Sequence, residues 1–362
     1  MIKERTWINL NRDNIKNNYN TFRSITQSKI MAVVKSNAYG HGLVVYSEIL
    51  DNLGVDYFGV DSITEATTLR EAGIEKPILI LGYTLLENFK IALEKNISVT
   101  VSNFDQLDEL LKRKDLKGLK IHLKFDTGMH RQGFGLTELN QIGKTLSSSI
   151  IVEGAYTHFA AAYEKFNEET QSQLKMFIQI TDYLKKIFPN IICHAAATSA
   201  TICYPESHFD MVRTGIGLMG IFSSKEVEKK HKDKISLRPV LSWHSIITEI
   251  KSLPKGSSIG YDYSETLRKD SIVGICPVGY WHGIPRSLSS KGEVLVNDKK
   301  AKILGRVCMD MIMLDLTGID AKVLDRVDII VGSSATMMAE QAQTSTYEII
   351  TRINPLIRKY IV

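Results

Sequence analysis

The chain has 362 residues, of which 44% are hydrophobic and 23% charged, with a formal net charge of +5 at pH 7. These proportions are typical of a globular protein, and the length exceeds that of one ordinary domain. The scattered basic residues exclude a nucleic-acid footprint, and no apolar run approaches the ~20 residues of a membrane span. The first residues, MIKERTWINL, lack the apolar core of a signal peptide, so we expect a cytoplasmic protein.

The first predicted element is the strand-like segment RTWINLN, after which Asn11 or Asp13 can cap a helix. From about residue 30 to 220, short apolar runs alternate with helical stretches, the longest being Glu168–Ile187. The expected strands are IMAVV, YFGV, PILILGY, ISVTV, GLKIHLKF, IIVEGAYTHF, IICHA and DMVRTGIGLMG. Repeated strand–helix units favour parallel strands, and seven or eight of them predict a TIM-like (β/α)₈ barrel, which we place at 11–230.

The pattern changes after residue 230, where strands are separated by turn residues. The segment Lys225–Lys234, rich in both charges, is expected to be a solvated connection. Beyond it, VND predicts a tight turn inside a hairpin, and little helix is expected before Tyr347–Arg352. We therefore predict a mainly antiparallel β domain at 231–362, completed by the strand within residues 1–10.

Lys35 is an unusual residue to find at the end of the buried run IMAVV, since lysine is rarely buried. Other polar residues also follow predicted barrel strands, and a solvated or capping role would explain each of them alone. The active sites of α/β barrels lie at the carboxyl ends of the strands, so their convergence there favours a ligand site. They are Lys124, Asp126, Arg131, His158, Thr198, Ser199 and Arg213.

These residues suit a phosphorylated aldehyde. The backbone N–H groups of Gly215 and Ile216, with the hydroxyls of Tyr39 and Thr198, suit a phosphate. A lysine beside them suits a covalent bond to an aldehyde cofactor. The four cysteines show no metal-binding spacing, and we expect no metal.

Seven segments, in order along the chain, resemble motifs of the alanine racemase family. They are MAVVKSNAYGHG, HLKFDTGMHRQG, EGAYTHFA, HFDMVRTGIGLMG, PVGYWHGIPR, GRVCMDMIMLDLT and TYEIITRINP. The resemblance covers essentially the whole chain. It implies an amino-acid racemase that uses pyridoxal 5'-phosphate (PLP), interconverts L- and D-alanine, and supplies D-alanine for peptidoglycan.

The resemblance implies two catalytic bases, Lys35, which also holds the cofactor, and Tyr261, with Tyr263 as the nearest competitor. Racemisation removes a proton from one face of the α-carbon and returns one to the other, so a single base would tend to restore the original hand. His158 and Arg213 are the candidates to stabilise the tyrosine phenolate, and Arg213 would face the pyridine nitrogen of the cofactor.

The remaining roles are also implied by the resemblance. The cofactor-binding residues would be Lys35, Tyr39, His158, Thr198, Arg213, Gly215, Ile216 and Tyr347. The substrate carboxylate would meet Arg131 and Met309, with Tyr280 nearby, while Lys124 (carbamylated in many members) would support Arg131, and Asp310 the tyrosine side. The family places the tyrosine of one chain beside the lysine of another, so a homodimer with shared sites is implied.

Three departures from the family pattern bear on phosphate binding and on specificity. Ala197 stands where asparagine is usual, and Trp281 and His282 replace small and acidic residues. Trp281 could reshape the substrate entrance, so a broad-specificity or serine racemase stays an alternative. A PLP carrier protein or an amino-acid decarboxylase is less favoured, because carriers generally lack the second domain and the glutamate–proline–glycine–arginine segment of decarboxylases is absent.

Overall fold

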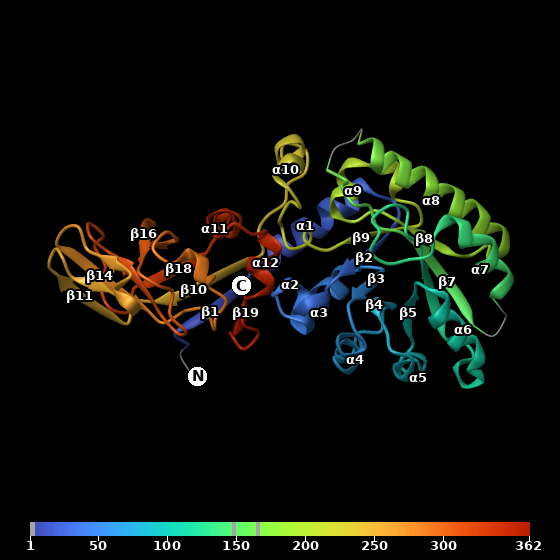
Figure 1. Ribbon diagram of the computed structural model, residues 1–362, viewed down its shortest axis with the longest axis horizontal. Coiled ribbons are helices and arrows are strands. Elements are labelled where there is room, and N and C mark those ends of the chain that lie inside the picture. Colours follow the sequence, from blue (N-terminus) through green and yellow to red (C-terminus); the bar gives the residue numbers. More distant parts are fainter. Residues whose placement is uncertain (1–3, 147–149, 164–166) are drawn as a thin grey trace. The chain divides into compact units, whose positions relative to one another are not determined.

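A computed structural model describes residues 4–146, 150–163 and 167–362. These residues form two compact units, shown along the chain in Figure 1. The barrel unit comprises Asn14–Ala38 and Leu43–Arg238, and the β unit comprises Met1–Asp13, Tyr39–Gly42 and Pro239–Val362. The chain therefore leaves the β unit, re-enters it briefly after the first barrel strand, and completes it with its last third.

The barrel unit contains eight parallel strands in the order β8-β7-β6-β5-β4-β3-β2-β9. Their bounds are β2 Lys29–Val33, β3 Tyr57–Val60, β4 Ile78–Tyr83, β5 Ile97–Val101, β6 Lys120–Lys124, β7 Ile151–Tyr156, β8 Ile192–His194 and β9 Met211–Thr214. The two outer strands of this order also meet, because the Arg213 N–H donates to the Ala196 carbonyl at 2.8 Å. A parallel bridge between Ala197 and Arg213 extends this contact. The predicted (β/α)₈ barrel is confirmed.

Helices connect these strands, as Figure 1 shows. Their bounds are α1 Arg12–Ile25, α2 Lys35–Tyr39, α3 Leu43–Leu53, α4 Ile63–Glu71, α5 Phe89–Glu94, α6 Phe104–Lys112, α7 Leu139–Thr145, α8 Glu168–Ile187, α9 Thr198–Cys203 and α10 Lys225–His231, with 3₁₀ turns η1 Leu86–Asn88, η2 Lys114–Leu116, η3 Leu136–Glu138 and η4 Pro205–Ser207. The long predicted helix is α8, whose first turn is capped by the Asn167 side chain.

The charged segment after residue 224 is a helix rather than an irregular connection. In α10, the Ser224 hydroxyl accepts a hydrogen bond from the Val227 N–H at 3.2 Å. Acidic residues occupy the first turn and basic residues the last, which complements the helix dipole. Capping and charge order therefore stabilise a helix where composition alone indicated only solvent exposure.

The β unit is a nine-stranded sheet in the order β11-β14-β17-β16-β15-β18-β10-β1-β19. The bounds are β1 Thr6–Leu10, β10 Leu241–Ile246, β11 Glu249–Leu253, β14 Ser271–Cys276, β15 Glu293–Val296, β16 Lys299–Leu304, β17 Ile312–Asp315, β18 Arg326–Ile330 and β19 Lys359–Ile361. All pairs are antiparallel except β1 with β19. The VND turn joins β15 to β16, with Asn297 and Asp298 at φ 48° and 61°.

The β unit holds more helix than the sequence indicated. Besides α12 (Thr346–Thr351), it contains α11 (Ser334–Ala342) and the 3₁₀ turns η5 (Tyr261–Tyr263) and η6 (Arg286–Leu288). In α11, Ala335, Met338 and Ala339 are buried, at helical spacing. The segment was missed because its apolar face consists of small residues and one methionine.

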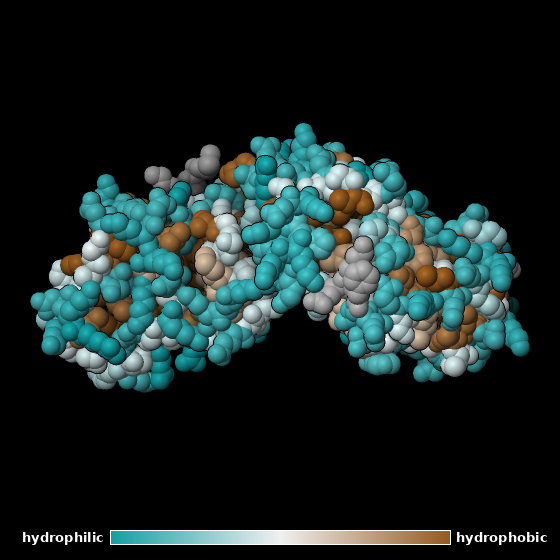
Figure 2. Space-filling view, turned by 90° about the horizontal axis from the view of Figure 1, so that it is seen from above, coloured by the Kyte–Doolittle hydropathy of each residue, from teal (hydrophilic) through white to brown (hydrophobic). Residues whose placement is uncertain are grey.

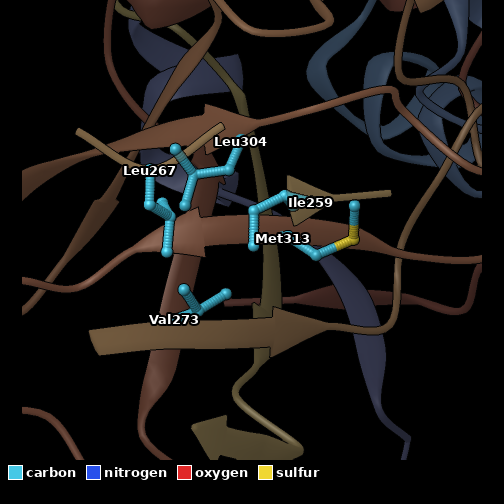
Figure 3. Close-up of a cluster of buried hydrophobic side chains, with 5 residues drawn as sticks. All are labelled: Ile259, Leu267, Val273, Leu304 and Met313. Carbon is cyan, nitrogen blue, oxygen red and sulfur yellow. The ribbon is translucent and has the colours of Figure 1, made fainter. Parts of the chain in front are cut away.

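A small hydrophobic cluster supports the turn that carries Tyr261. The two-stranded ribbon β12 (Ser258–Ile259) and β13 (Glu265–Thr266) flanks this turn. Figure 3 shows the side chains of the cluster. Its members are Ile259, Leu267, Val273, Leu304 and Met313. The ribbon is therefore anchored to the large sheet through Ile259 and Leu267.

In the face seen in Figure 2, hydrophilic residues cover much of the surface and hydrophobic residues lie between them. Within the described ranges, none of the helices has the length and hydropathy needed to cross a bilayer.

Candidate active site

Lys35 lies just beyond β2, at the carboxyl end of the barrel. Its Nζ donates a hydrogen bond to Oδ1 of Asp61 at 3.0 Å, and the side chain is 38% exposed. Asp61 directly follows β3, the neighbouring strand. Lys35 therefore lies at the strand end, as its position in the sequence indicated, and its amine is partly exposed and paired with the Asp61 carboxylate.

The backbone after Lys35 is strained. Ser36, Asn37, Ala38 and Tyr39 all have positive φ, between 50° and 57°. A left-handed conformation costs a residue with a side chain about 1–2 kcal/mol. Two hydrogen bonds of Asn37 stabilise the turn. Its backbone N–H donates to Glu65 Oε1 at 3.1 Å, and its side-chain Oδ1 accepts from the Leu43 N–H at 2.9 Å. Such strain is found where a functional group must be held in place, here at the lysine.

Arg213 extends from β9 into the barrel and is 4% exposed. Nη1 donates to Nδ1 of His194 at 2.9 Å and to the His194 carbonyl at 3.0 Å. Nη2 donates to the carbonyls of Thr157 and Ala195, at 2.7 and 2.9 Å, and lies 3.3 Å from Nδ1 of His158. Among the described residues, no hydrogen-bond partner is found for Nε–H. One donor of this buried cation is thus left for a ligand acceptor.

The histidines beside Arg213 are neutral. Burial, reinforced by the Arg213 charge, lowers the pKa of His158 to about 3. The same two causes hold the pKa of His194 well below its usual value. Burial also lowers the pKa of Arg213, to about 10, which leaves the guanidinium charged at neutral pH. The site therefore pairs one fixed cation with hydrogen-bond acceptors rather than with carboxylates.

This arrangement predicts acid sensitivity. The imidazole of His158 takes up a proton near pH ~6.5 in the unfolded chain but only near pH 3 in the folded one. Between these values the unfolded state binds more protons, so stability is full above pH ~6.5 and falls with acidification. We expect a loss of about 1–2 kcal/mol between pH 6.5 and 5, and a shallower loss in His158→Gln. Urea unfolding across this range measures both, and equal slopes would contradict the expectation.

Lys124 ends β6 and is 7% exposed. Burial and the charges of Arg131, Arg213 and Lys35 lower its pKa to about 8. Its Nζ donates to Oε1 of Gln132 at 2.9 Å. Arg131 is exposed in the loop that follows. The lowered pKa gives Lys124 an appreciable neutral, nucleophilic fraction near neutral pH.

The rim also carries a set of small and hydroxyl-bearing residues around Thr198. Oγ1 of Thr198 accepts hydrogen bonds from the N–H groups of Gly215 and Gly217, both at 3.3 Å. The N–H of Ile216, which is 1% exposed, has no hydrogen-bond partner within the described ranges. A Cβ on Gly217 would come within 2.4 Å of the Phe22 ring. Thr198, Gly215 and Ile216 are thus brought together as predicted.

The β unit brings together two further groups of the predicted residues. The rings of Tyr39 and Tyr347 lie 6.0 Å apart, centroid to centroid. The Tyr280 N–H donates to the Cys308 carbonyl at 2.9 Å, and the Trp281 N–H to the Met309 carbonyl at 3.0 Å. This packing requires Gly279, because a Cβ there would lie 2.2 Å from the Cys308 carbonyl oxygen.

His282 stabilises the same turn. It is 7% exposed, and its Nδ1 accepts a hydrogen bond from the Gly279 N–H at 3.2 Å. Burial lowers its pKa, while the Asp310 charge opposes the shift. His282 therefore acts as a hydrogen-bond acceptor within this turn. Trp281 is 57% exposed and has no such role.

Tyr261 opens a turn that projects from the sheet. Gly260 has φ 73°, and Asp262 and Tyr263 are also left-handed. An ion pair between Asp262 and Arg306, at 2.5 Å, closes the turn. Tyr261 and Tyr263 are 69% and 79% exposed, so both phenols face away from their own unit.

Several polar residues of the barrel were not anticipated from the sequence. They are Asp61, His122, Gln132, Glu153, Tyr156 and His194. Asp61 carries the same signal as Lys35, a polar residue directly after an apolar strand. His122 and His194 lie within apolar strands, where a polar residue signals an inward-facing network. Tyr156 stacks on His194, with the ring centroids 4.8 Å apart.

Comparison with known proteins gives a consistent result along the whole chain. The family described as "Alanine racemase, N-terminal domain" matches residues 10–223, and "Alanine racemase, C-terminal domain" matches residues 240–361. Alanine racemase from Desulforamulus reducens is 36% identical over 375 residues, covering 99% of this chain and 100% of that protein. Alanine racemase from Methanococcus maripaludis is 38% identical, covering 88% and 87%.

Solved structures agree with this result. The alanine racemase from D-cycloserine-producing Streptomyces lavendulae superposes with a TM-score of 0.93 at 30% identity, covering 100% of this chain and 98% of that one. The alanine racemase from Bacillus anthracis with bound L-Ala-P gives a TM-score of 0.93 at 32% identity, covering 100% and 96%.

Proposed function

Since this chain belongs to the alanine racemase family of isomerases, we propose that it interconverts L- and D-alanine with PLP by a two-base mechanism. The observation that carries this proposal is the barrel rim, where Lys35 stands at the end of β2 and Arg213 keeps Nε–H available for a ligand. The family is PLP-dependent, and its members named above are alanine racemases.

The residues present fit the cofactor. Lys35 offers an amine for its aldehyde, Arg213 Nε–H a donor for its ring nitrogen, and the buried N–H of Ile216 a donor for its phosphate. Thr198 and Gly215 adjoin this donor, and we assign the hydroxyls of Tyr39 and Tyr347 to the same phosphate. When bound, PLP supplies an electron sink for the negative charge left on the α-carbon after proton loss.

The chain's own residues move the proton. Lys35 Nζ serves one face of the α-carbon and the Tyr261 hydroxyl the other, so a proton removed by one is replaced by the other. Each positioned base contributes about 10²–10⁴-fold to the rate. His158 and Arg213 stabilise the tyrosine phenolate, and the positive charge of Arg213 makes that assignment electrostatically reasonable.

Arg213 has a second effect. A guanidinium donates hydrogen bonds but does not give up its proton. Facing a ring nitrogen, it leaves that nitrogen unprotonated and limits how much charge the ring withdraws. More of the burden then falls on the two bases, and side reactions such as transamination are suppressed.

The substrate carboxylate is assigned to Arg131 and Met309, with Tyr280 beside them. Lys124 supports Arg131, and its lowered pKa favours reaction of the neutral amine with CO₂, in which a C–N bond forms and one N–H proton leaves to solvent to give a carbamate. Asp310 supports the tyrosine side, since it follows Met309 directly and its charge reaches His282.

We assign activity to a homodimer in which each site takes its lysine from one chain and its tyrosine from the other. The β unit exposes several large aromatic and methionine side chains, which supports burial against a second copy. Its members are Tyr261, Tyr263, Tyr280, Trp281, Met309 and Met311, each at least 44% exposed. A verified monomer with full turnover would refute this assignment.

A chiral assay tests the function directly. The purified protein, supplied with PLP, is incubated with each common L-amino acid and the D-product is measured. Alanine is expected to give the largest kcat/KM, with D-alanine as the product. We propose that the enzyme acts in the cytoplasm and supplies this D-alanine for peptidoglycan synthesis. A larger value for serine would favour the alternative substrate and implicate Trp281 in the specificity. No turnover of any amino acid would overturn the proposal.

A further inference from the structure

The barrel interior contains a continuous polar chain that starts at Arg213. Nη1 of Arg213 lies 2.9 Å from Nδ1 of His194. Nε2 of His194 lies 2.9 Å from Nδ1 of His122, and Nε2 of His122 lies 3.2 Å from Oε2 of Glu153. Arg213 is 4% exposed, and both imidazoles are fully buried. Such a chain must have every donor facing an acceptor, because an unmatched buried polar group is costly.

The two ends fix the position of every proton in the chain. Arg213 can only donate, so Nδ1 of His194 accepts and its proton lies on Nε2. That N–H donates to Nδ1 of His122, whose proton therefore also lies on Nε2 and points at Glu153. The reverse arrangement would place an N–H of His194 against the guanidinium. Both rings are consequently neutral, between a cation and a carboxylate.

Glu153 is built to be the anionic end. Burial raises its pKa, but hydrogen bonds from His122, Ser98 and Tyr57 outweigh burial and lower the pKa of this carboxyl. Oε2 accepts from the Ser98 hydroxyl at 2.5 Å, and Lys120 Nζ lies 3.7 Å from Oε1. All these neighbours are donors, so the carboxylate is ionised across the physiological range.

The pairing between strands β6 and β7 determines where His122 and Glu153 lie. Between β6 and β7 the register shifts: Ile121 pairs with Val152, but His122 pairs with Gly154, which leaves Glu153 without a partner on β6. A bulge of this kind redirects a side chain and is common beside active sites. Gly154 is needed as well, because a Cβ there would lie 2.2 Å from Nδ1 of His122.

The hydrogen-bonded chain from Arg213 to Glu153 also links the two ends of the barrel. Glu153 is near the start of β7, beside Lys120, the first residue of β6. Arg213 reaches the carbonyl of Thr157, just beyond the end of β7. Glu153 therefore lies on the side of the network away from the rim, and it touches none of the residues to which we assign chemistry.

We propose that Glu153 and His122 are positioning residues of the racemase, which act through His194 to hold the Arg213 guanidinium in one orientation and in its charged, donating form. This inference rests on the function proposed above only for the role of Arg213. Without the carboxylate, the Nε2–H of His122 loses its acceptor, and the reversed arrangement, in which His194 turns its Nδ1–H toward Arg213, is no longer opposed at the far end of the network. The guanidinium must then move or lose a hydrogen bond.

Nuclear magnetic resonance of the holoprotein labelled with ¹⁵N-histidine tests the chain itself. His122 and His194, identified by comparison with single variants, should both show neutral rings protonated at Nε2 near pH 7. A proton on Nδ1, or a charged ring, at either residue would overturn the inference. This measurement needs no turnover, so it remains decisive even if the protein proved not to racemise alanine.

Kinetics of substituted proteins test the positioning role. His122→Gln keeps one acceptor and one donor at similar separation, whereas His122→Phe keeps neither. We expect kcat to fall about tenfold in His122→Phe with little change in KM, and to stay close to that of the unsubstituted protein in His122→Gln. Ser98→Ala is the matched control, since it removes a hydrogen bond to the same carboxylate oxygen but leaves the chain intact. Equal losses in the Phe and Gln variants, or a loss in Ser98→Ala as large as in His122→Phe, would show a structural role only.

Discussion

Replacing Lys35 with alanine is expected to lower racemisation at least about a thousandfold and to remove the visible absorbance that PLP shows when bonded to a lysine amine. The reason for the size of the effect is that one side chain performs two tasks. It holds the cofactor covalently, and its freed amine is the base on one face of the substrate. Absorbance spectroscopy and a chiral assay on the same sample measure the two losses separately.

The fold should survive this change. The recorded contact of the Lys35 amine is an ion pair with Asp61, and both side chains are more than a third exposed. Ion pairs of this kind contribute about 0–1 kcal/mol. Lys29→Ala is the matched control, because Lys29 is an exposed lysine at the other end of the same strand. If Lys35→Ala kept the absorbance, or Lys29→Ala lost it, the assignment of the cofactor lysine would be wrong.

The fold was largely predictable because each barrel strand has a strong local signal. Runs such as ISVTV are rich in β-branched residues and buried at every position, as expected of parallel strands covered on both faces. The long helix α8 was located to the residue, since its cap Asn167 and its charged ends agree. Helix α11 was missed because tertiary packing of Ala335 and Ala339, rather than a wide apolar face, stabilises it.

The site residues were predictable only where a charged side chain lies at or directly after the end of an apolar strand. Lys35, Lys124 and Arg213 stand out as charges in or directly after apolar runs. Glu153 gave no such signal, because its inward direction depends on the bulge between β6 and β7. A pairing register is a relation between two strands, and neither strand alone encodes it. The left-handed turn after Lys35 is equally hidden, since none of the four residues at positive φ is a glycine.

Replacing Tyr261 with phenylalanine is expected to slow proton exchange by about 10²–10⁴-fold, and to do so mainly from one enantiomer of alanine. Each base serves one face of the α-carbon, so the enantiomer whose proton points toward Lys35 should still exchange. Single-turnover exchange of solvent deuterium into L- and D-alanine measures the two faces separately. Equal losses from both enantiomers would argue against two bases with separate faces.

Tyr263→Phe is the matched control for this experiment. Tyr263 lies on the same left-handed turn, is 79% exposed against 69% for Tyr261, and is two residues away. Both substitutions remove only a hydroxyl from an exposed ring, so stability should change by less than about 0.5 kcal/mol in either. A face-selective loss in Tyr263→Phe, with Tyr261→Phe unaffected, would transfer the role of second base to Tyr263.

Mixing the two inactive proteins then decides which chain supplies the tyrosine. If each site takes Lys35 from one chain and Tyr261 from the other, a dimer of one Lys35→Ala chain and one Tyr261→Phe chain has one site with both substitutions and one site with neither. After random exchange of subunits, about a quarter of the original activity should return. If both residues came from the same chain, every site in every dimer would carry one substitution and no activity would return. The 69% exposure of Tyr261 is the observation that favours the first outcome, because the proposed catalytic phenol needs a second chain to enclose it.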